Sequence, residues 1–166
     1  MSARFPYHDE CNTLLEVTVD QAFAHLDDHS RLTEHMNKSS WMMAGSRMQL
    51  TFDALRGQAV GSHITMSGRV LGIPLFVEEV VSKRNPSLSK VWETIGETRL
   101  LVIGHYRMGF ELTPVAASCQ LRIFIDYARP KGWLSWCLSL LLGRYYARWC
   151  LQRMKNDAIS HFSQMR

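Results

Sequence analysis

The sequence of 166 residues lacks the features that mark an exported or cross-linked protein. Its opening stretch, MSARFPYHDECNTLLEV, has no apolar run between a basic head and a small-residue cleavage site, so we expect no signal peptide and a cytoplasmic location. The four cysteines are widely separated and form no Cys-x-x-Cys pair. In a chain without an export signal we expect them to be reduced and buried, which excludes a disulfide framework.

Long hydrophobic runs and domain boundaries are also missing. The segment Gly132–Gly143 is twelve residues without a charge, well short of the ~20 residues that a membrane-spanning helix needs. We find no internal repeat and no linker, and 166 residues are enough to bury a core of their own. The sequence therefore predicts a single domain over residues 1–166 with no transmembrane anchor.

Recognisable catalytic and metal-binding motifs are absent as well. There is no Gly-x-Ser-x-Gly motif, no Gly-rich phosphate loop and no convincing pair of nucleophile and base. His25 and His29 have the spacing of metal ligands on a helix, but Asp27 and Asp28 lie between them where that helix should end. No third ligand stands at a useful spacing, so the sequence predicts neither a metal site nor a cofactor.

Acidic residues are scarce at the C-terminal end. Residues 129–166 hold seven Lys or Arg but a single acidic residue, Asp157, whereas residues 1–128 hold twelve basic and fourteen acidic residues. The basic segment is also the most apolar one, a combination that suits an anionic lipid surface better than a nucleic acid. The simpler alternative is a solvated helix face. In either case we expect no nucleic-acid partner.

What the sequence does contain is a regular succession of strand and turn signals. Strands are predicted at residues 12–19, 47–54, 59–71, 75–84, 88–96, 99–113 and 118–128, separated by short connections that carry Gly, Pro and Asn. Short connections favour antiparallel pairing of neighbours. Two short helices are predicted directly after the first strand: QAFAHL, capped by Asp20, and RLTEHM, capped by Ser30.

The last part of the chain predicts a sheet with one apolar face and a helix to cover it. In CQLRIFIDY, apolar side chains from Cys119 to Tyr127 alternate with polar ones, and VIGHYRMGFEL alternates in the same way. From Trp133 to about Phe162 no proline occurs, which allows one long helix. One arc of that helix is apolar and should face the sheet; it consists of Trp133, Trp136, Leu140, Gly143, Ala147, Cys150, Leu151, Met154 and Ala158.

This order of elements resembles the helix-grip fold of the START and birch-pollen-allergen superfamily, also called SRPBCC or polyketide cyclase and lipid-transport proteins. VTVDQAFAHLDDHSRLTEHM is similar to the superfamily's opening, where a strand leads into a helix and a second turn. GRVLGIPLFVEEVV and WETIGETRLLVIGHYRMGFELTP resemble its central hairpins. The likeness covers nearly the whole chain but holds no catalytic signature. It implies an α+β fold in which a curved antiparallel sheet of about seven strands wraps around the C-terminal helix and leaves a cavity, commonly filled by a hydrophobic molecule.

The inward-facing residues should line that cavity. Gly143 and Ala147 are small where a core helix usually places leucine, which leaves room for a ligand or for a close strand. Tyr106 and Tyr127 would supply the few polar groups that orient a ligand in such a pocket. The alternative is that these residues pack on one another as ordinary core. The full candidate set is Trp41, Met48, Phe52, Met66, Trp92, Tyr106, Met108, Phe110, Ile123, Tyr127, Gly143, Ala147 and Met154.

Two neighbouring glutamates, Glu78 and Glu79, are the weak candidates for catalysis. In an alternating strand one of them should point inward, unless a bulge or an edge intervenes. A carboxylate buried in an apolar cavity has a raised pKa and can act as a general acid or base. The alternative is an edge residue or a partner for Arg69 or Arg107.

The outer arc of the long helix is also apolar where solvent is expected. Beside Arg144 and Arg148 it predicts contact with a second copy of the chain, giving a homodimer, or peripheral contact with the inner face of a membrane. Alternatively, another segment folds over it. The residues of this arc are Leu134, Leu138, Leu141, Leu142, Tyr145 and Trp149.

Three functions remain open from the sequence. The leading one is binding or transport of a hydrophobic small molecule, such as a lipid, a polyketide or an isoprenoid-like compound, without chemistry. The second is a cyclase, dehydratase or hydrolase that uses Glu78 or Glu79 with a tyrosine. The third is a protein-interaction module that docks through the C-terminal helix.

Overall fold

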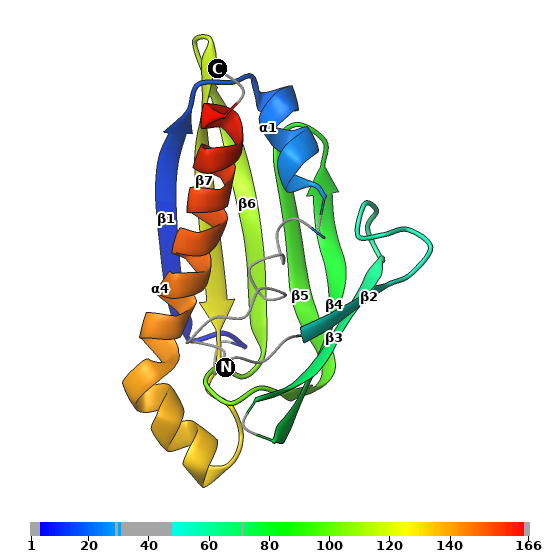
Figure 1. Ribbon diagram of the computed structural model, residues 1–166, viewed down its shortest axis with the longest axis vertical. Helices are drawn as coiled ribbons and strands as arrows, with labels where there is room; N and C mark the ends of the chain where they lie inside the picture. Colours follow the sequence, from blue (N-terminus) through cyan, green and yellow to red (C-terminus); the bar gives the residue numbers. More distant parts are fainter. Residues whose placement is uncertain (1–3, 29, 31–47, 71, 165–166) are drawn as a thin grey trace.

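The computed structural model describes residues 4–28, 30, 48–70 and 72–164, and in this part of the chain one antiparallel sheet carries two helices (Figure 1). The helices are α1 (Val19–Leu26) and α4 (Trp133–Ser163). The strands are β1 (Tyr7–Leu15), β2 (Met48–Phe52), β3 (His63–Val70), β4 (Ile73–Asn85), β5 (Ser89–Arg99), β6 (Tyr106–Val115) and β7 (Ser118–Tyr127).

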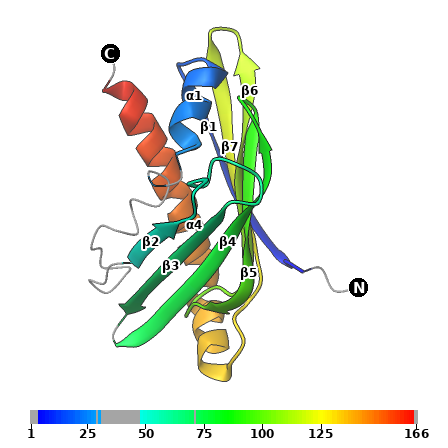
Figure 2. The ribbon, with the colours of Figure 1, turned by 90° about the vertical axis from the view of Figure 1, so that its right-hand side faces the viewer.

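The seven strands follow the order β1-β7-β6-β5-β4-β3-β2, and every neighbouring pair is antiparallel. Hairpins connect β2 through β7, whereas β1 crosses to the far edge and pairs with β7. Figure 2 shows that the β2 and β3 side of the sheet turns toward the side that holds α1 and α4. The predicted helix-grip architecture is therefore confirmed, with one helix after β1 in the described residues. The other predicted short helix, RLTEHM, lies outside them.

The first strand and its helix cap were predicted in the wrong places. β1 ends at Leu15, where its partner β7 also begins, because Leu15 is paired with Cys119. The N-cap of α1 is Thr18 and not Asp20: the Thr18 hydroxyl accepts from the Gln21 amide, and the Gln21 side chain accepts from the Thr18 amide. This reciprocal capping box satisfies two backbone donors, so the helix starts two residues earlier than predicted.

The connection between β5 and β6 also differs from the prediction. The expected break at GET does not occur, because β5 passes through Gly96 with a positive φ and continues to Arg99. The predicted strand 99–113 starts only at Tyr106, and residues 100–105 form a loop. Apart from Gly104 and His105 this loop is apolar: Ile103 is buried, and Leu100 and Leu101 pack against the core. Burial of the loop side chains holds this connection where turn residues hold the others.

The core lies between the sheet and the two helices. β6 and β7 bury alternate residues as predicted, including Met108, Phe110, Leu121 and Ile123. α4 contributes one stripe that is buried only from Ser139 onward, made of Ser139, Gly143, Ala147, Cys150, Leu151, Met154 and Ala158. Trp133, Trp136 and Leu140, predicted to continue this stripe, are exposed. Figure 1 shows the reason, since the first turns of α4 extend past the end of β1 and β7 and have no sheet beneath them.

Candidate functional site

Most of the predicted pocket residues lie together in the space between the sheet and α4. Phe52 is half-buried, Trp41 lies outside the described residues, and nothing is described for the side chain of Met48. The remaining ones are buried; they are Met66, Trp92, Tyr106, Met108, Phe110, Ile123, Tyr127, Gly143, Ala147 and Met154. All of these except Gly143 belong to one hydrophobic cluster. Their common inward position agrees with the pattern, while a cavity among them stays a prediction.

The small size of Gly143 has a specific explanation. A Cβ at this position would lie 2.9 Å from the Ser139 Oγ and 3.4 Å from the Val102 carbonyl oxygen. The loop between β5 and β6 therefore approaches the helix backbone closely at this point. The sequence offered two reasons for a small residue here, room for a ligand or for a close strand, and the neighbour that the structure shows is a loop.

The two neighbouring glutamates face opposite sides of the sheet. Glu79 is 1% exposed and points into the interior, whereas Glu78 lies on the outer face, where its Oε1 is 2.9 Å from the His63 Nδ1. The strand alternates through this pair in the usual way, although the ladder between β4 and β5 is shifted just before Glu78. Glu79 is thus the inward carboxylate that the sequence left undecided.

The Glu79 side chain on β4 contacts the Tyr106 side chain on β6, across the intervening strand β5. It is paired in register with Thr94 of β5, and the Thr94 hydroxyl accepts from the Tyr106 amide at 3.1 Å. The Tyr106 hydroxyl donates to the Glu79 Oε1. Regular pairing between β5 and β6 reaches only from Ser89 to Glu93. Thr94 therefore joins the two strands where the ladder stops and places the tyrosine beside the carboxylate.

The Tyr106 hydroxyl stays protonated over the ordinary pH range. Burial raises its pKa well above the usual value, and the negative charge of Glu79 raises it further. Burial acts in the same direction on the facing side chains of α4: it raises the pKa of Tyr146 well above its usual value and the pKa of the Cys150 thiol to about 12. The thiol and the two tyrosine hydroxyls therefore keep their protons at neutral pH.

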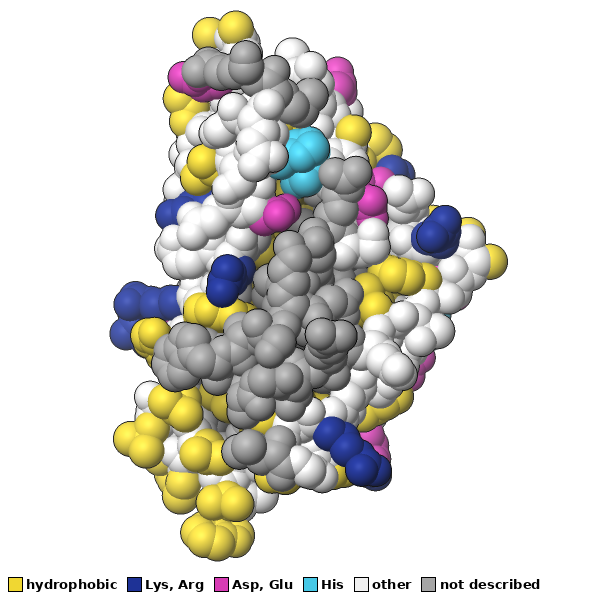
Figure 3. Space-filling view, viewed as in Figure 1, with side chains coloured by type: hydrophobic (Ala, Val, Ile, Leu, Met, Phe, Trp, Pro, Cys, Tyr) yellow, Lys and Arg dark blue, Asp and Glu magenta, His cyan; other side chains and the backbone are white. Residues whose placement is uncertain are grey.

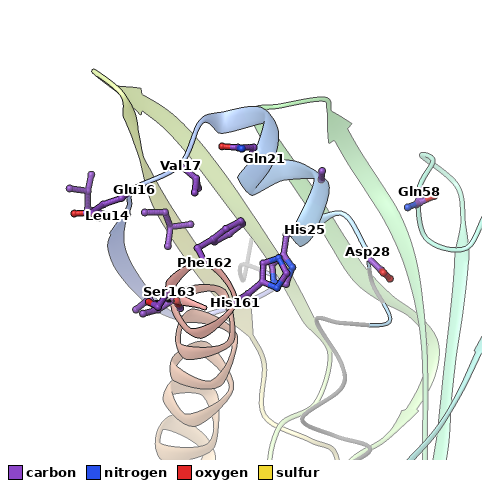
Figure 4. A pocket seen from close by; sticks show the side chains of 13 residues that line it. Leu14, Glu16, Val17, Gln21, His25, Asp28, Gln58, His161, Phe162 and Ser163 are labelled. Atoms are coloured by element: carbon purple, nitrogen blue, oxygen red, sulfur yellow. Dashed lines mark hydrogen bonds between the residues drawn. The ribbon is translucent and has the colours of Figure 1, made fainter. Parts of the chain in front are cut away.

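A cleft of about 1180 Å³ opens where α1 meets the C-terminal end of α4 (Figure 4). Its walls come from the end of β1, from α1 and from the last turn of α4, with Gln58 of the β2–β3 connection at one side. Leu15, Val17 and Phe162 line its apolar part. Leu15 belongs to the hydrophobic core, and the other two pack against it. None of the predicted pocket residues lines this cleft.

A stacked pair of histidines stands in this cleft. The rings of His25 and His161 are 3.9 Å apart between centroids and nearly parallel, and the His25 Nε2 lies 3.3 Å from an Asp157 carboxylate oxygen. Figure 4 shows both rings between α1 and α4. Sequence analysis considered His25 only with His29 and missed this pair, because His25 and His161 are far apart in the chain. Among the residues that the structure describes, no group of three potential metal ligands occurs.

A buried ionic network behind α1 was also missed. The Lys90 side chain is 0% exposed, and its Nζ donates to the Asp27 carbonyl at 2.7 Å and lies 3.2 Å from the Asp27 carboxylate. Arg84 donates two hydrogen bonds to the same carboxylate. Burial alone would raise the pKa of Asp27, but the bonds from Arg84 and the charge of Lys90 lower it overall. Because Asp27 at the end of α1 contacts Arg84 of β4 and Lys90 of β5, the network anchors the end of α1 to the sheet.

The predicted apolar arc on the outside of α4 is exposed in large part. Leu134, Leu141, Leu142 and Tyr145 are exposed, whereas Leu138 and Trp149 are half-buried. In the part of the chain that is described, no helix has both the length and the apolar character needed to cross a membrane.

Comparison with known proteins supports the fold alone. The chain matches no protein-family model and no curated protein. Solved structures do match, over almost the entire chain. They include the norcoclaurine synthase of Thalictrum flavum, with 13% identity, a TM-score of 0.66 and coverage of 96% of this chain and 95% of that one. The Zhui aromatase/cyclase of Streptomyces sp. R1128 has 12% identity, a TM-score of 0.64 and coverage of 95% and 94%.

A third similar structure is major latex-like protein 151 of Panax ginseng, with 13% identity, a TM-score of 0.56 and coverage of 94% of this chain and 97% of that one. Together these matches define the class: the chain has the helix-grip fold of the Bet v 1-like, or SRPBCC, proteins. Proteins with this fold commonly bind hydrophobic ligands. At these identities the likeness says nothing about which ligand, or which reaction, belongs to this chain.

Proposed function

We propose that this protein binds a hydrophobic small molecule between its curved sheet and α4, and that the cleft beside α1 is the way in. The observation that carries this proposal is the continuity of the cleft with the core, since Leu15, Val17 and Phe162 line the cleft and also contact the core cluster. An apolar molecule that enters there exchanges water for the apolar side chains of this wall. The cleft, with a volume of about 1180 Å³, is large enough to admit a lipid, a polyketide or an isoprenoid-like compound.

The interior also offers polar groups that would orient such a molecule. Glu79 and Tyr106 lie on the inward face of the sheet among apolar side chains, and the polar contacts of ligand pockets are few and fixed in this way. A hydroxyl or carbonyl group on the ligand would bond to this pair, and its apolar body would contact Met108 and Met154, whose flexible side chains adapt to different shapes.

The first test is native mass spectrometry of the protein purified without detergent, with solvent extraction of anything that stays bound. We expect a discrete hydrophobic adduct. A measurement that does not depend on retention of the natural ligand is the fluorescence of anilinonaphthalene sulfonate, which increases when the dye enters an apolar site. Lack of both an adduct and a saturable dye signal would contradict the proposal.

The route of entry is tested with Ala24→Trp. Ala24 is exposed on α1 and lines the cleft, so an indole there obstructs the opening while the core stays unchanged. We expect saturable dye binding to fall at least about tenfold, because the apolar part of the cleft is filled. The matched control is Gln152→Trp, which adds the same ring to an exposed position of α4 that does not line the cleft. Equal binding by the two variants would contradict this route.

The interior position is tested separately with Ala147→Trp. Ala147 is fully buried on the face of α4 that meets the sheet, so a tryptophan there occupies the space that a bound molecule would need. We expect the adduct to disappear while circular dichroism retains a cooperative melt. Unchanged uptake in a folded Ala147→Trp variant would contradict binding between the sheet and the helix, even if the cleft binds dye.

A second candidate function is acid–base catalysis on the bound molecule, and the Glu79–Tyr106 pair is the specific observation that favours it. The raised pKa of Tyr106 keeps its hydroxyl protonated at neutral pH, so that it has a proton to give, and Glu79 is the adjacent group that would accept a proton. Two of the similar structures carry enzyme names, aromatase/cyclase and norcoclaurine synthase, so the fold is compatible with catalysis.

Glu79→Gln and Tyr106→Phe separate catalysis from binding. Once extraction has identified a ligand, we expect both variants to keep their affinity for it within about tenfold, because the apolar contacts remain. If the protein is an enzyme, both lose turnover. Glu78→Gln on the outer face is the matched control and should turn over normally. A turnover that survives Glu79→Gln would exclude this pair as the acid–base machinery.

A further inference from the structure

The first turns of α4 form an apolar end that no part of the described sheet covers. Trp133 and Leu141 are each 81% exposed. Figure 3 shows hydrophobic side chains gathered at the lower end of the molecule, where Figure 1 places the start of α4. We call this surface the α4 tip; its exposed apolar residues are Trp133, Leu134, Trp136, Leu140, Leu141, Leu142 and Tyr145.

The exposed residues surround the helix and do not form one flat face. Trp133, Trp136 and Leu140 belong to the arc that continues the buried stripe, and Leu134 and Leu141 belong to the opposite arc. A symmetric dimer needs one self-complementary patch on each subunit. A helix end that is apolar over most of its circumference instead suits a fluid medium that can enclose it, as the interfacial region of a lipid bilayer does.

A second element presents apolar side chains at the same end of the molecule. Ile73 and Phe76, on the first part of β4, are 44% and 37% exposed. Figures 1 and 2 both place the β3–β4 hairpin at the end where α4 begins. Two separate elements therefore expose apolar groups at this end of the molecule.

The charges around this end have one predominant sign. Residues 128–156 contain no Asp or Glu, and Lys131 is exposed directly before the tip. The Arg129 guanidinium lies 5.5 Å above the Trp136 ring, a position from which it can contact a headgroup while the indole is inserted. At the hairpin, Arg69 and Arg99 are exposed, and the acidic residue Glu97 forms an ion pair with Arg99. Basic residues that border tryptophans and leucines complement the phosphate groups of an anionic bilayer.

We propose that the α4 tip and the β3–β4 hairpin insert into the surface of an anionic lipid membrane, so that the protein binds the membrane end-on and peripherally. The aromatic and leucine side chains of the tip enter the headgroup and upper acyl region, and Lys131, Arg129 and Arg69 bind lipid phosphates. This inference does not depend on the ligand site, because α4 meets the cleft only at its opposite end.

Co-sedimentation with vesicles tests the proposal. The full chain is mixed with vesicles of phosphatidylcholine alone or with about 30% phosphatidylglycerol, at low and at high salt. We expect binding to the anionic vesicles to be at least about tenfold stronger and to weaken as salt screens the phosphates. The tryptophan emission should shift to the blue on binding. Lack of binding, or equal binding to both kinds of vesicle, would overturn the proposal.

Paired variants locate the contact. Trp133→Ser with Leu141→Ser should lower binding at least about tenfold, and its fold should be unchanged because both side chains are already exposed. The matched control changes Val60 and Leu88 to serine, exposed residues of the β2–β3 and β4–β5 connections. For the charges, Lys131→Gln with Arg69→Gln is compared with Lys83→Gln and Arg56→Gln. Equal loss in test and control variants would refute the proposed orientation.

Self-association is the competing occupant of the tip, and sedimentation velocity without lipid distinguishes it. If the tip inserts into membranes, the wild type and Trp133→Ser with Leu141→Ser sediment as the same species. A wild-type dimer that this variant converts to monomers, without vesicle binding by the wild type, would overturn the proposal in favour of a dimer interface.

Discussion

The two faces of the sheet place the same kinds of charged residue in opposite environments, one exposed to solvent and the other enclosed. On the outer face, exposed carboxylates and bases form an open lattice in which Arg122 joins Glu10 to Glu111 and His8 joins Glu10 to Asp126. On the inner side, charges are few, and those found are enclosed, as in Glu79 with Tyr106 and Asp27 with Lys90.

Glu78 and Glu79 present this contrast at adjacent positions. Water screens the contact between Glu78 and His63, so its loss costs little. Glu79 is buried and accepts a hydrogen bond from the Tyr106 hydroxyl, so its removal leaves that buried hydroxyl without this acceptor. The contribution of a polar residue to the stability of this protein should therefore increase as its exposure to water decreases. Each of the following substitutions tests this rule.

Asp27→Asn should have the largest effect. It leaves the fully buried Lys90 ammonium without its carboxylate and removes the bidentate partner of Arg84. We expect a loss of about 3–5 kcal/mol in the free energy of unfolding, measured by urea denaturation. Since the pKa of Asp27 is lowered by folding, its contribution is present above the unfolded value of about 3.9 and is lost as pH falls through the folded value.

The double variant Asp27→Asn with Lys90→Met provides the control for this interpretation. Removal of the lysine charge eliminates the uncompensated buried ion, so we expect the double variant to recover a large part of the lost stability. If the double variant is as unstable as the single one, the loss comes from packing at the end of α1 and not from the buried charge.

Glu79→Ala against Glu78→Ala compares the two faces directly. The first leaves the buried Tyr106 hydroxyl without its acceptor, and we expect it to cost about 1–3 kcal/mol in urea denaturation. The second removes an exposed contact with His63 and should change stability by no more than about 0.5 kcal/mol. Equal effects of the two substitutions would show that burial does not determine the cost.

Arg122→Gln should have a smaller effect that depends on salt. Arg122 bonds to Glu10 and Glu111 on the outer face and is partly exposed, so we expect a loss of about 0.2–1 kcal/mol at low ionic strength. At about 0.5 M salt the difference from the wild type should shrink, because screening weakens exposed ion pairs. A difference that is unchanged by salt would indicate that the contact between Arg122 and the Phe124 ring carries the effect.

The sequence predicts which face each residue occupies better than it predicts which residues meet. Period-two alternation assigned Tyr106, Met108 and Phe110 to the interior, because alternation is a local property of a strand. The contacts between Glu79 and Tyr106, and between His25 and His161, join residues far apart in the chain. No local pattern encodes such distances, so the sequence could name an inward glutamate and a tyrosine without pairing them.

The long helix α4 shows the same limit of prediction from sequence. Its periodicity predicted one continuous buried stripe from Trp133 to Ala158, but the stripe is buried only from Ser139 onward, because the first turns have no sheet beneath them. Helical periodicity specifies which side chains share a face, not how far the partner surface extends. The cleft beside α1 was missed for the same reason, because it forms where three segments end rather than within any one of them.

His8 should give the smallest effect, and one that depends on pH. The hydrogen bond to Asp126 raises the pKa of His8 above its usual 6.5, burial opposes this slightly, and Glu10 adds to the rise. A raised pKa means that the stabilisation is fully present below the unfolded value of about 6.5 and is lost as pH rises through the folded value. We therefore expect His8→Gln to be less stable than the wild type at about pH 5.5 and equal to it at about pH 8.5. Urea denaturation at the two pH values measures this difference, and because the ring is largely exposed it should stay below that of Arg122→Gln. A loss of stability that is larger at the higher pH would mean that His8 stabilises the fold as a neutral hydrogen-bonding ring. Charge would then contribute less to the stability of the outer face than its ion pairs suggest.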